Sequence, residues 1–121
     1  MKKYSSLKEI QTLISQKQLT LTDLLAYYFK QIKENEHLNA FNEVFFYSAE
    51  AQAKAVQQKI ENGTAGKLAG MVIGIKDNIC YKDHVVTASS KMLDGFVSPY
   101  SSTVVQRFIT RRCGYYRPLK L

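Results

Sequence analysis

Apolar residues recur every three or four positions in the first part of this sequence, which is the spacing of one face of an α-helix. A later stretch is rich in alanine, glutamine, glutamate and lysine, all strong helix formers. These patterns predict three helices, over residues 6–17, 23–35 and 49–61. The expected N-caps are Ser5 or Ser6, Thr22 and Ser48, and Gly63 is expected to end the third helix.

Two further apolar runs are short enough to be β-strands. The run at 44–46 predicts a short buried strand, and the run at 68–75 predicts a buried strand whose glycines allow other backbone to approach closely. Residues 79–102 carry serine, threonine, glycine and proline at short intervals, which is typical of loops. Residues 103–109 return to a helical pattern. The chain is therefore expected to combine helices with a few buried strands.

Length, charge and cysteine content limit the classes of protein to which this chain can belong. The 121 residues suffice for one small domain, and the formal net charge is +7. The charge is spread along the chain, so a solvated lysine-rich surface is favoured over a nucleic-acid or membrane patch. Neither a signal-peptide core nor a membrane-length apolar run occurs, and a soluble, cytoplasmic protein is expected. Cys80 and Cys113 lack zinc-ligand spacing, so we expect reduced thiols and no metal.

Lys76 is the first candidate for chemistry, because it directly follows the apolar run at 68–75. A lysine that leaves a buried strand loses hydration of its charged form, and a neutral amine can act as a general base that activates a hydroxyl nucleophile. The alternative is that the Lys76 stem leaves the strand end and extends its ammonium group into water. The neighbouring Asp77 is open to a role as an ion-pair partner.

Other polar residues are expected to have structural roles. His37 and His84 each stand alone in polar surroundings, so both are expected at the surface. Ser89 and Ser90 follow Thr87 in a hydroxyl-rich stretch, and such stretches hydrogen-bond to their own backbone. The sequence contains neither a GxSxG turn nor a phosphate-binding glycine loop.

Several segments together resemble the amidase signature family. Residues 68–80 (LAGMVIGIKDNIC) resemble the lysine segment of that family. Residues 88–93 (ASSKML), with Phe96, Pro99, Tyr100 and 102–105 (STVV), are more similar to the A subunits of tRNA-dependent amidotransferases than to general amidases. Residues 24–32 and 38–41 also resemble the amino-terminal region of those A subunits.

This resemblance implies a fold, a reaction and a set of partners. The fold would be α/β, the amino-terminal and incomplete part of the amidase signature fold, in which helices cover a mixed sheet. The reaction would be that of a carbon–nitrogen ligase with glutamine as amido donor, in which Lys76 matches the family's catalytic lysine and acts with two serines. The partners would be the B and C subunits of the complex and, through them, tRNA. No cofactor is expected in this chain, because ATP and Mg²⁺ would be used by a partner subunit.

The last residues depart from the family pattern. Residues 1–107 are expected to be an amino-terminal portion of an amidase domain, and residues 108–121 an aberrant tail. Codons that encode the tail can, when read one nucleotide later, encode the apolar strand that relatives carry there, so a frameshift near residue 107 is one explanation. A genuine short carboxyl terminus is the other. In either case the chain is expected to lack the catalytic serines and to be inactive alone.

Two other functions remain open from the sequence. The first is an amidase-signature hydrolase that acts on small amides. The second is a small basic protein that binds a partner subunit or RNA, for which the net charge of +7 is the only signal.

Overall fold

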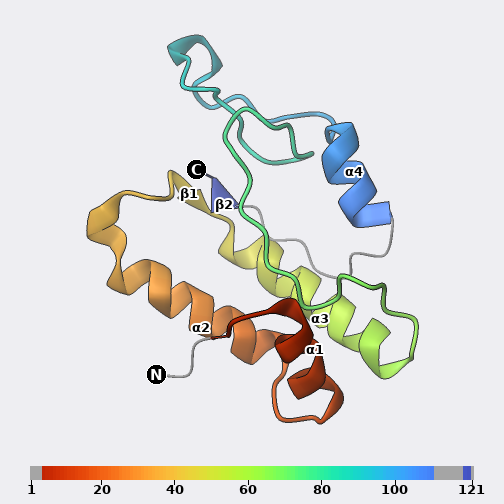
Figure 1. Ribbon diagram of the computed structural model, residues 1–121. Helices are drawn as coiled ribbons and strands as arrows, with labels where there is room; N and C mark the ends of the chain where they lie inside the picture. Colours follow the sequence, from red (N-terminus) through yellow and green to blue (C-terminus); the bar gives the residue numbers. More distant parts are fainter. Residues whose placement is uncertain (1–3, 111–118, 121) are drawn as a thin grey trace.

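The computed structural model describes residues 4–110 and 119–120. This part of the chain forms four α-helices, two 3₁₀-helices and one two-stranded antiparallel sheet (Figure 1). The α-helices are α1 (Leu7–Ser15), α2 (Leu21–Glu34), α3 (Phe46–Glu61) and α4 (Thr103–Thr110). The 3₁₀-helices are η1 (Glu36–Leu38) and η2 (Lys91–Leu93), and the strands are β1 (Glu43–Val44) and β2 (Leu119–Lys120).

The first three α-helices form the main hydrophobic core. They lie together in the lower half of Figure 1, and the segment from residue 76 to α4 lies above them. Helices α2 and α3 pack directly against each other, and α1 adds Ile10 and Ile14 to the same apolar cluster. A second, smaller cluster joins the upper segment to α4 through Ile75, Tyr81 and Val105. The three-helix layer is therefore the base on which the loop-rich upper segment rests.

The starts of α1 and α2 follow local capping chemistry, with one correction to the expected caps. Ser6 caps α1, because its side chain accepts a hydrogen bond from the Glu9 amide. Thr20, and not the expected Thr22, caps α2: its hydroxyl accepts from the Asp23 amide over 3.1 Å, and the Asp23 carboxylate accepts from the Thr20 amide over 3.2 Å. This reciprocal pair is a capping box. Thr22 is exposed in the first turn.

The third helix begins earlier than its composition predicts. It starts at Phe46, and Phe45 occupies the N-cap position without a side-chain hydrogen bond. Ser48, the expected cap, lies within the first turn, so that prediction is wrong. The strand expected at 44–46 is also shorter, because β1 ends at Val44 and is half-buried. Gly63 follows the end of α3 with a φ of +70°, as expected of a residue that ends a helix.

The strand expected at 68–75 is wrong. Two turns occupy its first half, in which the Ala69 amide donates to the Gly66 carbonyl oxygen and the Met71 amide donates to that of Leu68. Gly70 adopts a φ of +89°, and a Cβ there would lie only 3.2–3.3 Å from side-chain atoms of α1. The run is apolar because Ala69 and Gly70 pack against α1, whereas Ile73 and Ile75 belong to the smaller cluster with Val105. Hydrophobicity alone does not distinguish such packing from strand pairing.

The segment 79–102 is loop-like, as predicted. An irregular antiparallel pairing holds it together: Val85 and Val97 form a β-bridge, the Val86 amide donates to the Phe96 carbonyl oxygen over 3.0 Å, and the Ser98 amide donates to that of His84 over 3.0 Å. The helix expected at 103–109 is confirmed as α4. No helix in the part of the chain that the structure describes is long and apolar enough to cross a membrane.

The expected division of the chain at residue 107 stays a prediction. The division falls inside α4, which continues to Thr110. Most of the expected tail, 111–118 and 121, lies outside the described residues. The two tail residues of β2 pair with β1, with Lys120 opposite Glu43 and Leu119 opposite Val44.

Candidate functional site

Lys76 lies in a segment whose side chains alternate between buried and exposed positions. Ile75 and Asp77 are buried, whereas Lys76 and Asn78 are exposed. The backbone then turns, because the Ile79 amide donates to the Lys76 carbonyl oxygen over 3.0 Å. Lys76 therefore follows a single β-bridge residue, Ile75, and not the longer strand expected at 68–75, and its side chain is exposed. Its catalytic role stays a prediction.

Asp77 is the buried charged residue next to this lysine, with 6% of its surface exposed. One carboxylate oxygen, Oδ1, accepts from the Thr87 amide over 2.8 Å, and the other, Oδ2, accepts from the Thr87 hydroxyl. The Asp77 carbonyl oxygen also accepts from the Ala88 amide over 2.9 Å. A buried carboxylate needs such donors, because it has lost its hydration. We call these three hydrogen bonds the Asp77–Thr87 clamp.

The clamp also shapes the hydroxyl-rich loop that follows Thr87. The Thr87 hydroxyl oxygen accepts from the Ser89 amide over 3.3 Å, and the Thr87 carbonyl oxygen accepts from the Ser90 amide over 2.8 Å. Ala88 and Ser89 have φ values of +47° and +59°, in the left-handed region that residues with a side chain seldom adopt. The predicted bonding of the loop to its own backbone is confirmed, with Thr87 as the side chain that supplies it.

His84 is half-buried in a packed cluster, so it is less exposed than the sequence predicts. Its ring stacks on Tyr81, with ring centroids 3.9 Å apart, and meets the edge of Phe45 at 4.4 Å. Its Nδ1 lies 2.7 Å from the Lys82 carbonyl oxygen, and its Nε2 lies 3.1 Å from the Ser48 hydroxyl. Since a carbonyl oxygen only accepts, Nδ1 carries a proton. The histidine thereby joins α3 to the upper segment.

Tyr81 adds a second link between the same two parts. The Gln52 side-chain amide donates to its phenol oxygen over 2.5 Å. Burial raises the pKa of Tyr81 above its ordinary value of 10.0, although hydrogen bonds from Gln52 and Ser48 partly offset this effect. The phenol is therefore neutral at physiological pH, and its hydroxyl group serves as a structural hydrogen-bond partner.

The remaining sequence candidates do not converge on a site. His37 is exposed, as predicted. Cys80 is half-buried with its Sγ 3.6 Å from the Tyr100 hydroxyl, and Cys113 lies outside the described residues. Within 4–110 and 119–120, no group of three histidine, cysteine or acidic side chains comes together to hold a metal ion.

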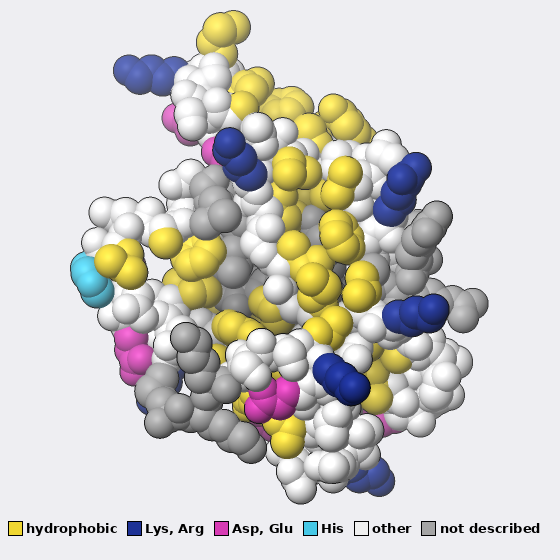
Figure 2. All heavy atoms as spheres, viewed as in Figure 1, with side chains coloured by type: hydrophobic (Ala, Val, Ile, Leu, Met, Phe, Trp, Pro, Cys, Tyr) yellow, Lys and Arg dark blue, Asp and Glu magenta, His cyan; other side chains and the backbone are white. Residues whose placement is uncertain are grey.

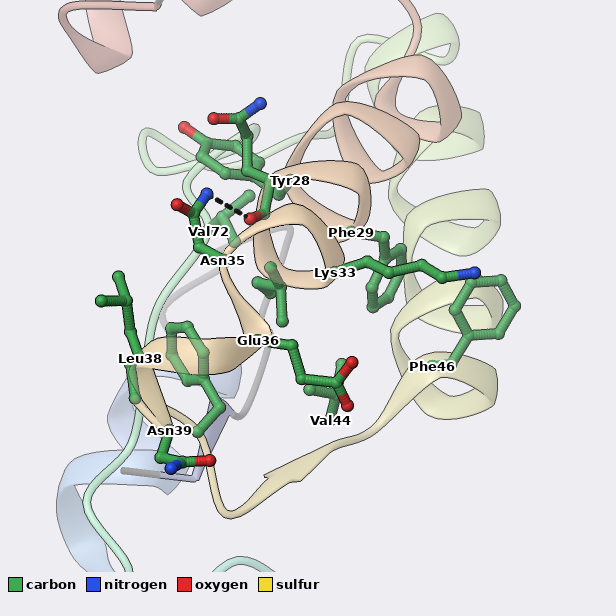
Figure 3. Close-up of a pocket in the computed structure, with 14 residues that line it drawn as sticks. Tyr28, Phe29, Lys33, Asn35, Glu36, Leu38, Asn39, Val44, Phe46 and Val72 are labelled. Carbon is green, nitrogen blue, oxygen red and sulfur yellow. Dashed lines mark hydrogen bonds between the residues drawn. The ribbon is translucent and has the colours of Figure 1, made fainter.

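A largely apolar groove lies away from Lys76, between the end of α2, η1, β1 and the start of α3. Its volume is about 900 Å³. Figure 2 shows apolar side chains gathered around a hollow on this face of the molecule. In Figure 3, Lys33 extends past Phe29 toward Phe46, while Val72 and Leu38 come from other segments. Neither Lys76 nor Asp77 lines this groove.

The region around Lys76 therefore offers an exposed primary amine on a segment that the Asp77–Thr87 clamp joins to a hydroxyl-bearing loop. An uncharged amine can take a proton from a hydroxyl group. Sequence reasoning identified the lysine and the loop but missed the clamp. The only available signal was an acidic residue two positions after the end of an apolar run, which does not reveal a partner ten positions away.

Comparison with known proteins identifies the family of this chain. The amidase family model matches residues 23–111, which is most of the chain. The chain belongs to the amidase family.

Curated relatives show which members of this family the chain resembles. The chain is 48% identical over 77 residues to the A subunit of glutamyl-tRNA(Gln) amidotransferase from Brachyspira hyodysenteriae, covering 64% of this chain and 16% of that protein. It is 40% identical over 100 residues to the corresponding A subunit from Methanobrevibacter smithii, covering 81% and 22%. The chain thus spans about a fifth of the length of the curated relatives it matches.

Solved structures support the fold. One solved structure is an inhibitor-bound vestigial protein complex that is described as revealing the evolutionary origins of an s-triazine catabolic enzyme. It matches 96% of this chain and 25% of its own, with a TM-score of 0.81 and 21% identity. A crystal structure of an amidase matches 97% and 27%, with a TM-score of 0.77 and 20% identity. The predicted amidase fold is confirmed for the part that the chain covers, which is mainly helical with little strand.

Proposed function

We propose that this chain contributes to a glutamine-dependent tRNA amidotransferase as part of its A subunit, the component that releases ammonia from glutamine. The observation that carries the proposal is its 36–48% identity to proteins named as A subunits of glutamyl-tRNA(Gln) amidotransferase. The proposed partners are the B and C subunits, with tRNA engaged through the complex in the cytoplasm. A partner in the complex, and not this chain, would use ATP and Mg²⁺.

In this proposal Lys76 is the general base. Its neutral amine takes a proton from a serine hydroxyl, and a serine oxygen then attacks the side-chain amide carbon of glutamine. The carbon–nitrogen bond breaks, the departing nitrogen gains a proton and leaves as ammonia, and water releases glutamate from the serine. Ser89 and Ser90 receive no catalytic role, because their position does not match either serine of the family.

The test is a chimaera in which residues 1–107 of this chain replace the corresponding part of the A subunit from Brachyspira hyodysenteriae, assembled with the B and C subunits of that organism. We expect ammonia release from glutamine, and we expect Lys76→Ala to lower it by at least about a thousandfold, because the nucleophile loses its base. Lys82→Ala is the matched control, since Lys82 is also exposed and lies six positions further on. Full activity of Lys76→Ala would refute the assigned base.

The runner-up is an amide hydrolase that acts on small amides, which the structural match to an amidase favours at the level of fold. The same chimaera is assayed with propionamide. If the small amide is cleaved faster than glutamine at equal concentration, the hydrolase is the better description.

A further inference from the structure

We propose that Asp77 and Thr87 are positioning residues for Lys76, and that the Asp77–Thr87 clamp sets the direction in which the amine points. This inference rests on the function proposed above for Lys76. It assigns no chemistry to the clamp itself, because Asp77 and Thr87 would act through the lysine.

The first step is the geometry of the backbone around Lys76. Side chains at adjacent positions of this segment face opposite ways, so the position of Asp77 fixes that of Lys76. Ile75 on the other side is buried as well, in contact with the small cluster of Tyr81 and Val105. With both neighbours held inward, the lysine side chain is directed outward, on the side opposite the buried carboxylate.

The second step is the strength of the anchor on Asp77. A carboxylate with only 6% of its surface exposed is costly unless donors replace its lost water. Thr87 supplies two donors to its two oxygens, one from the amide and one from the hydroxyl. A hydrogen bond to a charged acceptor is roughly twice as strong as one between neutral groups. Thr87 therefore holds Asp77 in a single orientation.

The third step is the backbone strain in the two residues that follow Thr87. Ala88 and Ser89 are both held in the left-handed backbone region, where a residue with a Cβ is strained. The Ala88 amide is nevertheless directed at the Asp77 carbonyl oxygen, and the Ser89 amide at the Thr87 hydroxyl. Strain of this kind persists only where surrounding interactions over-determine it, and it concentrates at sites where geometry matters for function.

The experiment uses the same assembled chimaera with substitutions in the clamp. We expect Thr87→Val to lower kcat for ammonia release by about ten- to a hundredfold, while KM for glutamine changes by less than about twofold, because misplacing a reacting group slows the chemical step. Thr87→Ser, which keeps the hydroxyl, is expected to stay within about threefold of the parent. Asp77→Asn removes the charged acceptor and is expected to behave like Thr87→Val. If one of these two variants fails to fold, the other still tests the positioning role.

The chain contains a matched control for loss of a threonine–aspartate hydrogen bond. Thr20 also donates its hydroxyl to an aspartate, Asp23, over 2.5 Å, but in the cap of α2. Thr20→Val removes the same kind of hydrogen bond and is expected to leave kcat unchanged. Amide hydrogen exchange of the full 121-residue chain checks that each variant keeps α2 and α3 folded.

The outcomes separate this inference from the function on which it rests. If Lys76→Ala abolishes activity and both clamp variants keep the parent kcat, the proposed function stands and the positioning role is wrong. A rise in KM at constant kcat would also overturn it, because the clamp would then serve substrate binding. If Thr87→Ser is as slow as Thr87→Val, the hydroxyl is not the positioning group. An inactive parent chimaera, or an active Lys76→Ala variant, overturns the proposed function and this inference together.

Discussion

At the scale of single residues, the functions of polar side chains depend on contacts between distant positions. Tyr81 and His84 lie close together in the sequence, but their partners Gln52 and Ser48 are on α3. These contacts turn an apparently solitary histidine into a packed one. The same applies to Asp77, whose donor Thr87 comes ten residues later.

The buried phenol of Tyr81 predicts a loss of stability at alkaline pH. Its folded pKa is raised above 10.0, the ordinary value that it regains in the unfolded chain. As the pH rises above 10.0 the unfolded chain loses its proton first, so the stability present below pH 10.0 falls progressively until the pH passes the folded pKa. Urea unfolding at about pH 8 and about pH 11 should show this decrease, and Tyr81→Phe should reduce it.

Tyr47→Phe is the control for this measurement, because Tyr47 is 86% exposed. We expect it to leave the decrease between the two pH values unchanged. A decrease of the same size in Tyr81→Phe and in the parent would show that Tyr81 does not contribute to it.

At the scale of elements, the helices were predictable, whereas the irregular conformation of residues 68–75 was not. The helices follow from periodicity and capping types that act within one turn, and α1, α2, α3 and α4 all form where the sequence places them, within a few residues. The apolar run at 68–75 obeys no such local rule. Its glycines allow a turn as well as a strand, and packing on α1 selects the turn.

The start of α2 offers a direct test of which threonine is the cap. Thr20→Ala should lower the free energy of unfolding by about 1 kcal/mol, because the Asp23 amide loses its acceptor. Thr22→Ala should change it by less than about 0.5 kcal/mol, since Thr22 is exposed within the helix and alanine is the better helix former. Chemical denaturation of both variants distinguishes the two. If Thr22→Ala lowered the free energy of unfolding more than Thr20→Ala, Thr22 would be the cap.

At the scale of the whole molecule, the core is unevenly divided. Among the described residues, the cluster shared by α1, α2 and α3 contains ten buried apolar residues, whereas the cluster of the upper segment contains three. The side chains of Tyr81 and His84 join the upper segment to α3. It also exposes large apolar side chains, including Met92 at 94% and Tyr100 at 58%.

This division predicts uneven protection of backbone amides. Amides in the middle of α2 and α3, such as those of Tyr28 and Val56, should exchange with solvent at least about tenfold more slowly than those of Val86 and Ser98, because fewer buried contacts must break to open the upper segment. Hydrogen exchange followed by NMR measures this difference. Equal protection in both regions would show that the two clusters open as one unit.

The sequence by itself determined the helices, the loop at 79–102, the position of Lys76 after an apolar run and the resemblance to amidases. These features depend on residue types acting over a few positions, where backbone hydrogen bonds and caps are decided locally. Tertiary structure alone decided that the run at 68–75 folds into turns on α1, that His84 packs against α3, and that Thr87 holds Asp77. Burial and hydrogen bonding between positions ten or more apart exist only once the chain has folded, so no local pattern could reveal them.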